Sequence, residues 1–340
     1  MNNKIRIGLI GFGHLGAIHA ENIVASNIAE LHAVCDIDTN ALEHAKSQYG
    51  ARVNTDINEF LANTLDGVVI ASSTSQHLKH IDAIARKGIP IFTEKPIGLT
   101  LEQTDEVLQE IVNANVPFQI GFQRRWDPRY RKVKEIIESG EIGKPVLFKA
   151  YGRDPNASKP ENWGLDKNGG LFLNAAIHDY DAARFLFGTE VEKLSATGAV
   201  LVYSDLANFG DIDTCSTTLF MKDGAMAMTE WSRYATYGYD VGMEIICSEG
   251  VARIGRADTS PVAVYHKNEM APSVFEVFAD AFKAEVEGFL SAIVERRPMS
   301  PGVEDARIAL QLALAARVSL ESGSKLVDIT PLAPLSSMSV

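Results

Sequence analysis

The sequence has 340 residues, of which 46% are hydrophobic and 22% charged, a composition typical of globular proteins and unlike that of disordered chains. With 44 acidic and 32 basic residues, its formal net charge is −12. This balance disfavours nucleic acid as a partner, because phosphate binding requires a basic surface. The stretch "QRRWDPRYRKVK" (123–134) stands out as locally basic.

The cysteines and the N-terminus favour a reducing, cytoplasmic location. Cys35, Cys215 and Cys247 are odd in number and form no CxxC, so neither a disulfide framework nor a zinc site is expected. The N-terminal apolar run leads directly into a glycine motif and lacks the features of a signal peptide. No stretch approaches the roughly 20 apolar residues that span a bilayer, so we expect no membrane contact.

The first 120 residues alternate predicted strands and helices. Apolar runs predict strands at 5–12, 31–37, 66–72, 89–96 and 117–122. Helical patterns start near residue 15 and then cover 40–50, 75–88 and 100–115. Near-continuous apolar strands that alternate with helices predict a parallel sheet covered by helices on both faces, an α/β fold.

The pattern changes after about residue 120. A predicted helix (128–143), a strand (145–154) and a second helix that begins near residue 171 lead into β-rich stretches from 191 to about 267. These lack intervening helices and predict an open, largely antiparallel sheet with one exposed face. Helical stretches at 275–297 and 303–323 close the chain. We expect a Rossmann domain at 1–122 and a C-terminal domain at 123–340, with closing helices that pack back on the first domain.

The stretch "GLIGFGHLG" carries a dinucleotide-binding fingerprint. Gly11, Gly13 and Gly16 form G-x-G-x-x-G between a predicted strand and helix, and Asp36 ends the second strand 20 residues later. The first glycine permits a tight turn, the second lets the main chain approach a pyrophosphate, and the third allows close helix packing. The helix N-terminus attracts phosphate. The residues predicted to contact the cofactor in this loop are Gly11, Phe12, Gly13, His14, Leu15 and Gly16.

Asp36 also selects the cofactor. Its carboxylate can accept hydrogen bonds from the ribose hydroxyls of NAD but would repel the 2′-phosphate of NADP. The residues that follow, "IDTN" (37–40), offer no arginine or lysine to bind that phosphate. We therefore predict NAD.

Two further stretches carry candidate chemistry. Lys95 in "TEKPIG" (93–98) ends the fourth strand, where doubly wound folds bind ligands, and is either a surface lysine or a group that hydrogen-bonds or deprotonates an alcohol. In "LFLNAAIHDYD" (171–181), Asn174 and His178 lie four residues apart and share a helical face. That face could be a metal site, a buried polar cluster or a catalytic site. We favour catalysis and expect no metal, because too few ligands share the face.

The motifs "GFGHLG", "STSQHLKH", "TEKPIG", "QIGFQRRWDPRY" and "GGLFLNAAIHDYDAARFLFG" together resemble the glucose-fructose oxidoreductase, inositol dehydrogenase and rhizopine-catabolism (Gfo/Idh/MocA) family over nearly the whole chain. The resemblance is greatest to the inositol 2-dehydrogenase branch. It implies a Rossmann domain, a second α/β domain for substrate and oligomer contacts, and a homo-oligomer, often a tetramer. It also implies that Lys95, followed by a cis proline peptide, and His178 are catalytic.

The resemblance implies further site residues. On the cofactor side these are Ser73, His77, Glu94, Lys95 and Gln123, although His77 and His80 could also be metal ligands or lie on a helix surface. The implied substrate contacts are Lys95, Arg153, Asp154, Asn174, His178 and Tyr237, where Arg153 and Asp154 could instead form a surface ion pair and Tyr237 belong to the sheet. Asp181 either orients His178 or pairs with Arg184. Trp163 either closes over the nicotinamide or belongs to the core.

These residues suit reversible oxidation of a secondary alcohol. Hydride would leave the carbinol carbon for nicotinamide while His178 takes the hydroxyl proton, Lys95 stabilises the developing alkoxide and Asn174 fixes a neighbouring hydroxyl. The family usually has aspartate where this chain has Asn174, and an amide cannot take a proton. We predict an NAD-dependent dehydrogenase of myo- or scyllo-inositol; the alternatives are a dehydrogenase of a pyranose or anhydrosugar and a non-catalytic NAD(H) sensor.

Overall fold

The computed structural model describes residues 4–155, 165–255, 263–267 and 273–335. Contacts between residues divide the chain into two compact units. The first comprises Met1–Gln123, Asp280–Arg307 and Ala333–Val340, and the second comprises Arg124–Ala279 and Ile308–Leu332. Among the helices described, none is both long and apolar enough to cross a membrane.

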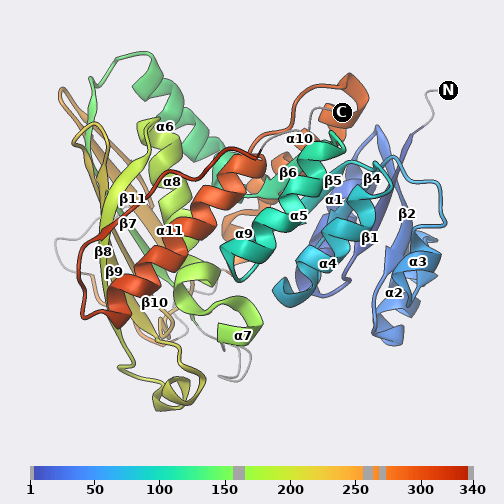
Figure 1. Cartoon of the computed structure of the whole chain (residues 1–340), viewed down its shortest axis with the longest axis horizontal. Helices are drawn as coiled ribbons and strands as arrows, with labels where there is room; N and C mark the ends of the chain where they lie inside the picture. Colours follow the sequence, from blue (N-terminus) through green and yellow to red (C-terminus); the bar gives the residue numbers. More distant parts are fainter. Residues whose placement is uncertain (1–3, 156–164, 256–262, 268–272, 336–340) are drawn as a thin grey trace. The chain divides into compact units, whose positions relative to one another are not determined.

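The first unit is built on a six-stranded parallel sheet of order β3-β2-β1-β4-β5-β6 (Figure 1). The strands are β1 (Ile5–Ile10), β2 (Ala29–Cys35), β3 (Arg52–Asn54), β4 (Gly67–Ile70), β5 (Ile91–Glu94) and β6 (Phe118–Gly121). All neighbouring strands pair in parallel, which confirms the predicted α/β fold. The strand β3 escapes prediction because three residues are too few to show a pattern.

The helices of this unit are α1 (His14–Ala25), α2 (Thr39–Tyr49), α3 (Ile57–Phe60), α4 (Thr74–Ala85), α5 (Leu101–Asn113) and α10 (Ala279–Glu295). Side-chain caps start three of them, α2, α3 and α5. Asp38 caps α2 by accepting a hydrogen bond from the Asn40 amide at 2.9 Å, and Gly50 ends it with φ of 68°. Thr100 caps α5 through the Gln103 amide.

The core on one face of this sheet includes residues far apart in the sequence. Ile7, Leu9 and Phe92 on the strands are fully buried together with Phe289 and Leu290 of α10. Because α10 is part of this unit, the parallel sheet does not complete its core with the first 123 residues alone.

The second unit is built on a seven-stranded mixed sheet of order β12-β11-β7-β10-β9-β8-β13. Its strands are β7 (Pro145–Arg153), β8 (Val191–Ala199), β9 (Thr214–Met221), β10 (Met226–Ser232), β11 (Asp240–Cys247), β12 (Val251–Ile254) and β13 (Val327–Asp328). The sheet is largely antiparallel, as predicted; β10 and β7 form a parallel pair. A parallel pair requires a long connection, and the chain between β7 and β10 contains α8 (Ile177–Phe187) as well as the strands β8 and β9.

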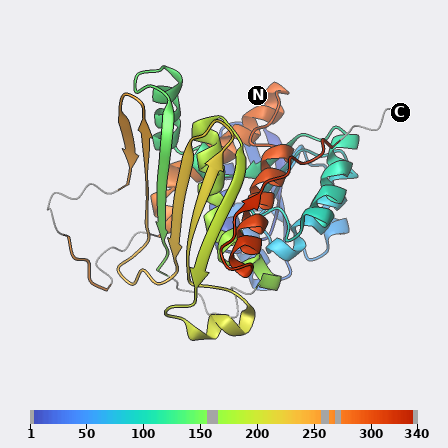
Figure 2. The same ribbon diagram turned by 60° about the vertical axis from the view of Figure 1, so that its left-hand side comes forward.

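Helices cover one face of this sheet and leave the other open (Figure 2). The remaining helical segments described are η1 (Gln123–Arg125), α6 (Pro128–Glu138), α7 (Leu165–Asn168), η3 (Phe172–Ala176), α8 (Ile177–Phe187), η4 (Ser204–Phe209), α9 (Val274–Val277) and α11 (Val303–Glu321). Both η1 and α11 begin in the first unit and continue into the second. Buried and less buried residues alternate along β9 and β10. On the open face Met226 and Met228 are 37% and 44% exposed.

Gly16 and Gly13 provide a matched test of the packing around the glycine loop. A Cβ at Gly16 would lie 2.0 Å from the main-chain oxygen of Gly11, whereas one at Gly13 would meet no heavy atom within 4 Å. We expect Gly16→Ala to lower the free energy of unfolding by about 2–3 kcal/mol, and Gly13→Ala by about 1 kcal/mol or less. Urea unfolding measures both values, and equal losses would contradict this packing.

Candidate functional site

The glycine loop leaves space for an anion at the start of α1. Gly11 has φ of +89°, and a Cβ there would lie 2.5 Å from the main-chain nitrogen of Ser72, so only glycine fits. Gly13 is the N-cap of α1, and no side chain caps the helix at that position. Gly13 and His14 are exposed and Leu15 is partly exposed. Main-chain N–H groups at an uncapped helix N-terminus suit the pyrophosphate of a dinucleotide.

Asp36 is held beside this loop by the main chain. Its Oδ2 accepts a hydrogen bond from the Phe12 amide at 2.5 Å, and its Oδ1 accepts one from the Asp38 amide at 2.9 Å. Phe12 packs its buried ring edge-on against Tyr49, so the main chain of Phe12, and not its ring, faces the loop. The carboxylate therefore stays near the end of β2, where a ribose would bind.

Ile37 is a candidate cofactor contact that the motif search does not find. Its side chain is 92% exposed and directly follows Asp36. A single exposed apolar residue is common on protein surfaces, but this one lies beside the carboxylate expected to bind the ribose, where the apolar face of an adenine ring could cover it. The only sequence signal for this contact is an apolar residue directly after the acidic residue that ends the second strand.

His77 joins two of the predicted cofactor segments. Its ring nitrogens lie 2.9 Å from the carbonyl oxygens of Pro96 and Ser72, and its side chain is 1% exposed. Burial lowers its pKa. The interpretation of His77 as helix surface is therefore wrong, and its contacts link the end of β4 to the segment after Lys95. Ser73, by contrast, is exposed at the start of α4.

Lys95 follows β5 and is partly exposed, and its peptide bond to Pro96 is cis. The preceding residue, Glu94, is buried, and its Oε1 lies 2.8 Å from Nε2 of His19 on α1. Gln123 is only 4% exposed. The predicted cofactor residues of the first unit thus lie in the glycine loop and at or just after the carboxyl ends of β2, β4, β5 and β6. Doubly wound sheets bind ligands at this edge.

In the second unit, the segment with Asn174 and His178 is not a regular α-helix. Phe172–Ala176 forms a π-helical turn, and α8 begins only at Ile177. Asn174 lies within the π turn and His178 in the first turn of α8, so the two side chains come from consecutive helical turns of different type. Asn174 is partly exposed and His178 is 8% exposed. Single π turns within helices often occur at functional sites.

The two aspartates after His178 anchor α8 through buried ion pairs. Asp179 accepts hydrogen bonds from the Arg124 guanidinium and from the Trp231 indole. Asp181 pairs with Arg125 at 2.6 Å, and Nη1 of Arg184 lies 3.6 Å from it. Asp181 thus pairs with Arg125 and with Arg184; the pair with Arg184 is one of the two alternatives that the sequence left open for Asp181.

The basic stretch 123–134 therefore does not form a simple basic surface. Arg124 is 2% exposed, and its guanidinium lies over the rings of Tyr130 and Trp231. Removal of one partner from a buried ion pair costs about 3–5 kcal/mol. Arg124 and Arg125, which pair with Asp179 and Asp181 of α8, therefore stabilise the helix that carries His178.

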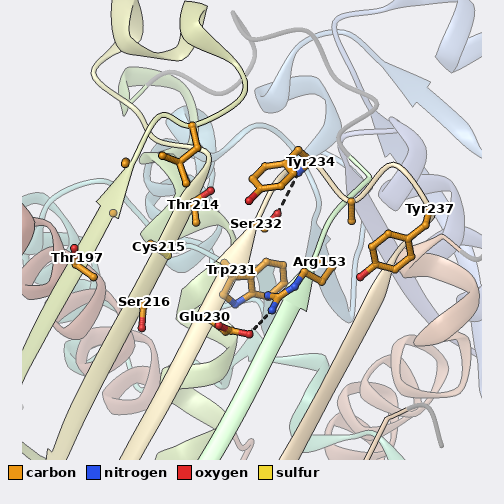
Figure 3. Close-up of a pocket in the computed structure, with 14 residues that line it drawn as sticks. Arg153, Thr197, Thr214, Cys215, Ser216, Glu230, Trp231, Ser232, Tyr234 and Tyr237 are labelled. Atoms are coloured by element: carbon orange, nitrogen blue, oxygen red, sulfur yellow. Dashed lines mark hydrogen bonds and ion pairs between the residues drawn. The ribbon is translucent and has the colours of Figure 1, made fainter. Parts of the chain in front are cut away.

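The remaining predicted substrate residues lie at one end of the mixed sheet. Arg153 and Tyr237 line a pocket of about 490 Å³ (Figure 3). Arg153 forms an ion pair with Glu230 of β10 and not with Asp154. The main chain of Asp154 bonds to that of Ser232 at 2.9 Å. Asn174, His178 and Asp154 are not among the described residues that line this pocket.

Tyr237 lies in the connection between β10 and β11. Its hydroxyl donates to Asp240 at 3.4 Å, and its ring stacks on Tyr265 with centroids 5.7 Å apart. Burial and the Asp240 carboxylate raise its pKa, so the hydroxyl stays a donor at neutral pH. The alternative that Tyr237 belongs to the sheet is wrong. Trp163 lies outside the described residues.

Comparisons with known proteins agree with this architecture. Residues 5–122 match the model of the oxidoreductase family with an NAD-binding Rossmann fold, and residues 130–253 match that of the GFO/IDH/MocA C-terminal domain. The fold and the fingerprint thus define a two-domain, NAD-dependent oxidoreductase. The chain belongs to the Gfo/Idh/MocA family.

Relatives extend the likeness over nearly the full length. A myo-inositol 2-dehydrogenase from Thermotoga maritima is 35% identical over 93% of this chain and 96% of that protein. A scyllo-inositol 2-dehydrogenase (NAD(+)) from Bacillus subtilis is 33% identical over 95% and 96%. The crystal structure of scyllo-inositol dehydrogenase from Lactobacillus casei, with bound NAD(H) and scyllo-inositol, has a TM-score of 0.87 at 32% identity and covers 96% of this chain and 99% of its own.

Asp36 can be tested against its acidic neighbour Asp38. We expect Asp36→Ala to raise the KM for NAD at least about tenfold and to reduce the preference for NAD over NADP, because it removes the ribose acceptor and the charge that repels a 2′-phosphate. Asp38→Ala removes the cap of α2 and should lower stability while leaving that preference unchanged. Steady-state kinetics with NAD and with NADP measure the preference as the ratio of the two kcat/KM values. An unchanged ratio in Asp36→Ala would contradict the role of Asp36 in selecting the cofactor.

Proposed function

We propose that the protein oxidises a secondary hydroxyl of a cyclic polyol, with myo- or scyllo-inositol as substrate and the corresponding inosose as product. The observation that carries this proposal is the likeness to inositol dehydrogenases over more than nine-tenths of the chain, in both units. A Rossmann unit alone would indicate only that the protein binds a dinucleotide. The second unit also matches the C-terminal domain of the Gfo/Idh/MocA family, so the likeness includes the domain expected to bind the substrate.

The cofactor roles follow from the geometry of the first unit. The amides at the start of α1 would hold the pyrophosphate, Asp36 the ribose hydroxyls, and Ile37 one face of the adenine. Ser73, His77, Glu94, Lys95 and Gln123 are proposed for the nicotinamide side; the side chains of His77 and Glu94 are engaged in the interior, which leaves mainly their main chain for this role. When bound, NAD supplies the acceptor for the hydride that leaves the carbinol carbon.

The acid–base roles are proposed from the family resemblance. The imidazole of His178 takes the hydroxyl proton, and Lys95 donates a hydrogen bond to the same oxygen and stabilises its developing charge. Asn174 binds a neighbouring hydroxyl through its amide. An amide is adequate for this task because only binding is required, and proton transfer is left to His178.

The substrate roles of Arg153, Asp154 and Tyr237 are also proposals. The Tyr237 hydroxyl is a fixed donor, and Arg153 and Glu230 offer charged groups that suit adjacent hydroxyls. For Arg153 to contact the polyol, its ion pair with Glu230 would have to be shared with the substrate.

We further propose a cytoplasmic homo-tetramer. All three cysteines are unpaired and buried, as in proteins from a reducing compartment. The exposed methionines on the open sheet face suit an interface between subunits. Light scattering of the purified protein measures the mass of the assembly.

The function is tested by incubating the purified protein with NAD or NADP and a panel of inositols, aldoses and anhydrosugars, with reduced nicotinamide followed by absorbance. We expect turnover with an inositol and NAD, and little with NADP. Turnover only with a pyranose or anhydrosugar would replace the substrate. Cofactor binding without turnover on any polyol would favour the sensor, which Asn174 alone suggests.

The acid–base roles predict a specific loss in two variants. Lys95→Met and His178→Asn should each lower kcat by about 10²–10⁴-fold, because each removes a group that acts on the reacting hydroxyl, while NAD affinity changes little. Lys79→Met is the control, since Lys79 is an exposed lysine on α4 outside the proposed site. Stopped-flow turnover and NAD titration separate the two effects. Retained kcat in either variant would remove that residue from the mechanism.

A further inference from the structure

Three ionisable side chains meet in the interior of the first unit. They come from elements far apart in the sequence: His19 from α1, Glu94 from the end of β5 and Glu285 from α10. One ligand atom from each lies within 4.8 Å of the others. His19 and Glu285 are fully buried and Glu94 is 5% exposed.

Glu285 is unusual because its carboxyl group lacks hydrogen-bond partners. In the described part of the chain, neither of its side-chain oxygens accepts a hydrogen bond. The Gln119 amide from β6 donates to the main-chain oxygen of Glu285 at 2.9 Å, but not to its side chain. Burial and the negative charge of Glu94 raise the pKa of Glu285 well above its ordinary value. An ionised carboxylate in this place would be desolvated and repelled by a like charge.

Two ionised carboxylates beside one imidazole would leave at least one negative charge in the cluster unbalanced. His19 already faces Glu94 at 2.8 Å and can offset at most one negative charge. A proton on Glu285 removes the second charge without any further ligand. A divalent cation would also balance the cluster, but the surroundings are partly apolar: the rings of Phe92 and Phe282 pack edge-on against His19, with centroids 5.3 and 6.2 Å from the imidazole centroid.

We propose that Glu285 carries a proton in the folded protein at neutral pH, and that the His19–Glu94–Glu285 cluster is a positioning device for the end of β5. Glu94 directly precedes Lys95, and a Cβ at Gly121 would lie only 3.0 Å from the Glu94 carboxylate. The carboxylate thus fits a narrow slot whose other side is His19. Glu285 acts through Glu94 and does not touch the substrate; only the link to Lys95 rests on the proposed function.

Infrared spectroscopy tests the proton directly. The C=O stretch of a protonated carboxyl is separate from the carboxylate bands. We expect this band in the wild-type protein at pH 7, its loss in Glu285→Gln, and its retention in Glu287→Gln. Glu287 is the matched control because it lies on the same helix, is partly exposed and accepts a hydrogen bond from the Ser26 hydroxyl. Absence of the band in the wild type, or its persistence in Glu285→Gln, would overturn the proposal.

The pH dependence of unfolding gives a second readout. The folded state holds a proton that the unfolded state releases above the ordinary pKa of 4.5. The stabilisation from this proton is therefore complete below pH 4.5 and is lost as the pH rises towards the raised pKa of the folded state. Across that window the folding equilibrium constant of the wild type should fall by up to about tenfold more per pH unit than that of Glu285→Gln. Glu287→Gln should keep the wild-type slope, and identical slopes in all three proteins would contradict the proposal.

Two further measurements separate the remaining outcomes. Elemental analysis should find no stoichiometric divalent metal, and a metal that is present in the wild type and lost in Glu285→Gln would replace the proton and overturn the proposal.

In the proposed reaction, ionisation of Glu285 at high pH would disturb Glu94 and Lys95. The alkaline limb of kcat/KM should therefore move to higher pH in Glu285→Gln and not in Glu287→Gln; no movement would remove the link to Lys95. The infrared and unfolding results do not depend on any substrate.

Discussion

The close approach of α1 to the turn at Gly11 is the constraint on which the cofactor-binding half depends. The helix passes so near the Gly11 carbonyl that Gly16 has no room for a side chain, and the turn itself lies against the main chain of Ser72. Because the helix, the turn and the end of β4 fit together in this way, the N-terminus of α1 is held where a phosphate can approach it. The Asp36 carboxylate then holds Phe12 in place and leaves the loop open at Gly13. Backbone packing, more than any side-chain contact, therefore sets the cofactor geometry.

The elements that could be predicted from sequence are those whose signal is local. Apolar strands, the Gly50 C-cap and the Thr100 N-cap each depend on a few adjacent residues, and each is present. The strand β3 is too short to produce a pattern. The π turn at Phe172–Ala176 has the same residue types as an α-helix, and its hydrogen bonds depend on how the segment packs. The π turn around Asn174 is therefore a feature that residue types alone do not predict.

Charged residues explain most of what the sequence could not predict about the site. The locally basic stretch that contains Arg124 and Arg125 suggests a basic surface, yet both residues pair with aspartates more than 50 residues later in the chain. Glu94 reads as a neighbour of the cofactor, but its carboxylate lies against His19. In each case burial creates the need for a partner, and burial is a property of the tertiary fold. The candidate residues were identifiable from motifs, whereas their partners were not.

The position of α10 has a consequence for how the protein is made. The sheet of the first unit includes only residues before 123, but Phe289 and Leu290 complete its core against Ile7 and Phe92. At a synthesis rate of about 5–20 residues per second, these strands wait on the order of ten to thirty seconds for the helix that covers them. During that interval α1 and α2 can cover part of this sheet face, but the apolar part that packs against α10 remains exposed. Binding by a chaperone, or temporary cover by other parts of the chain, would then protect the protein from aggregation before its synthesis is complete.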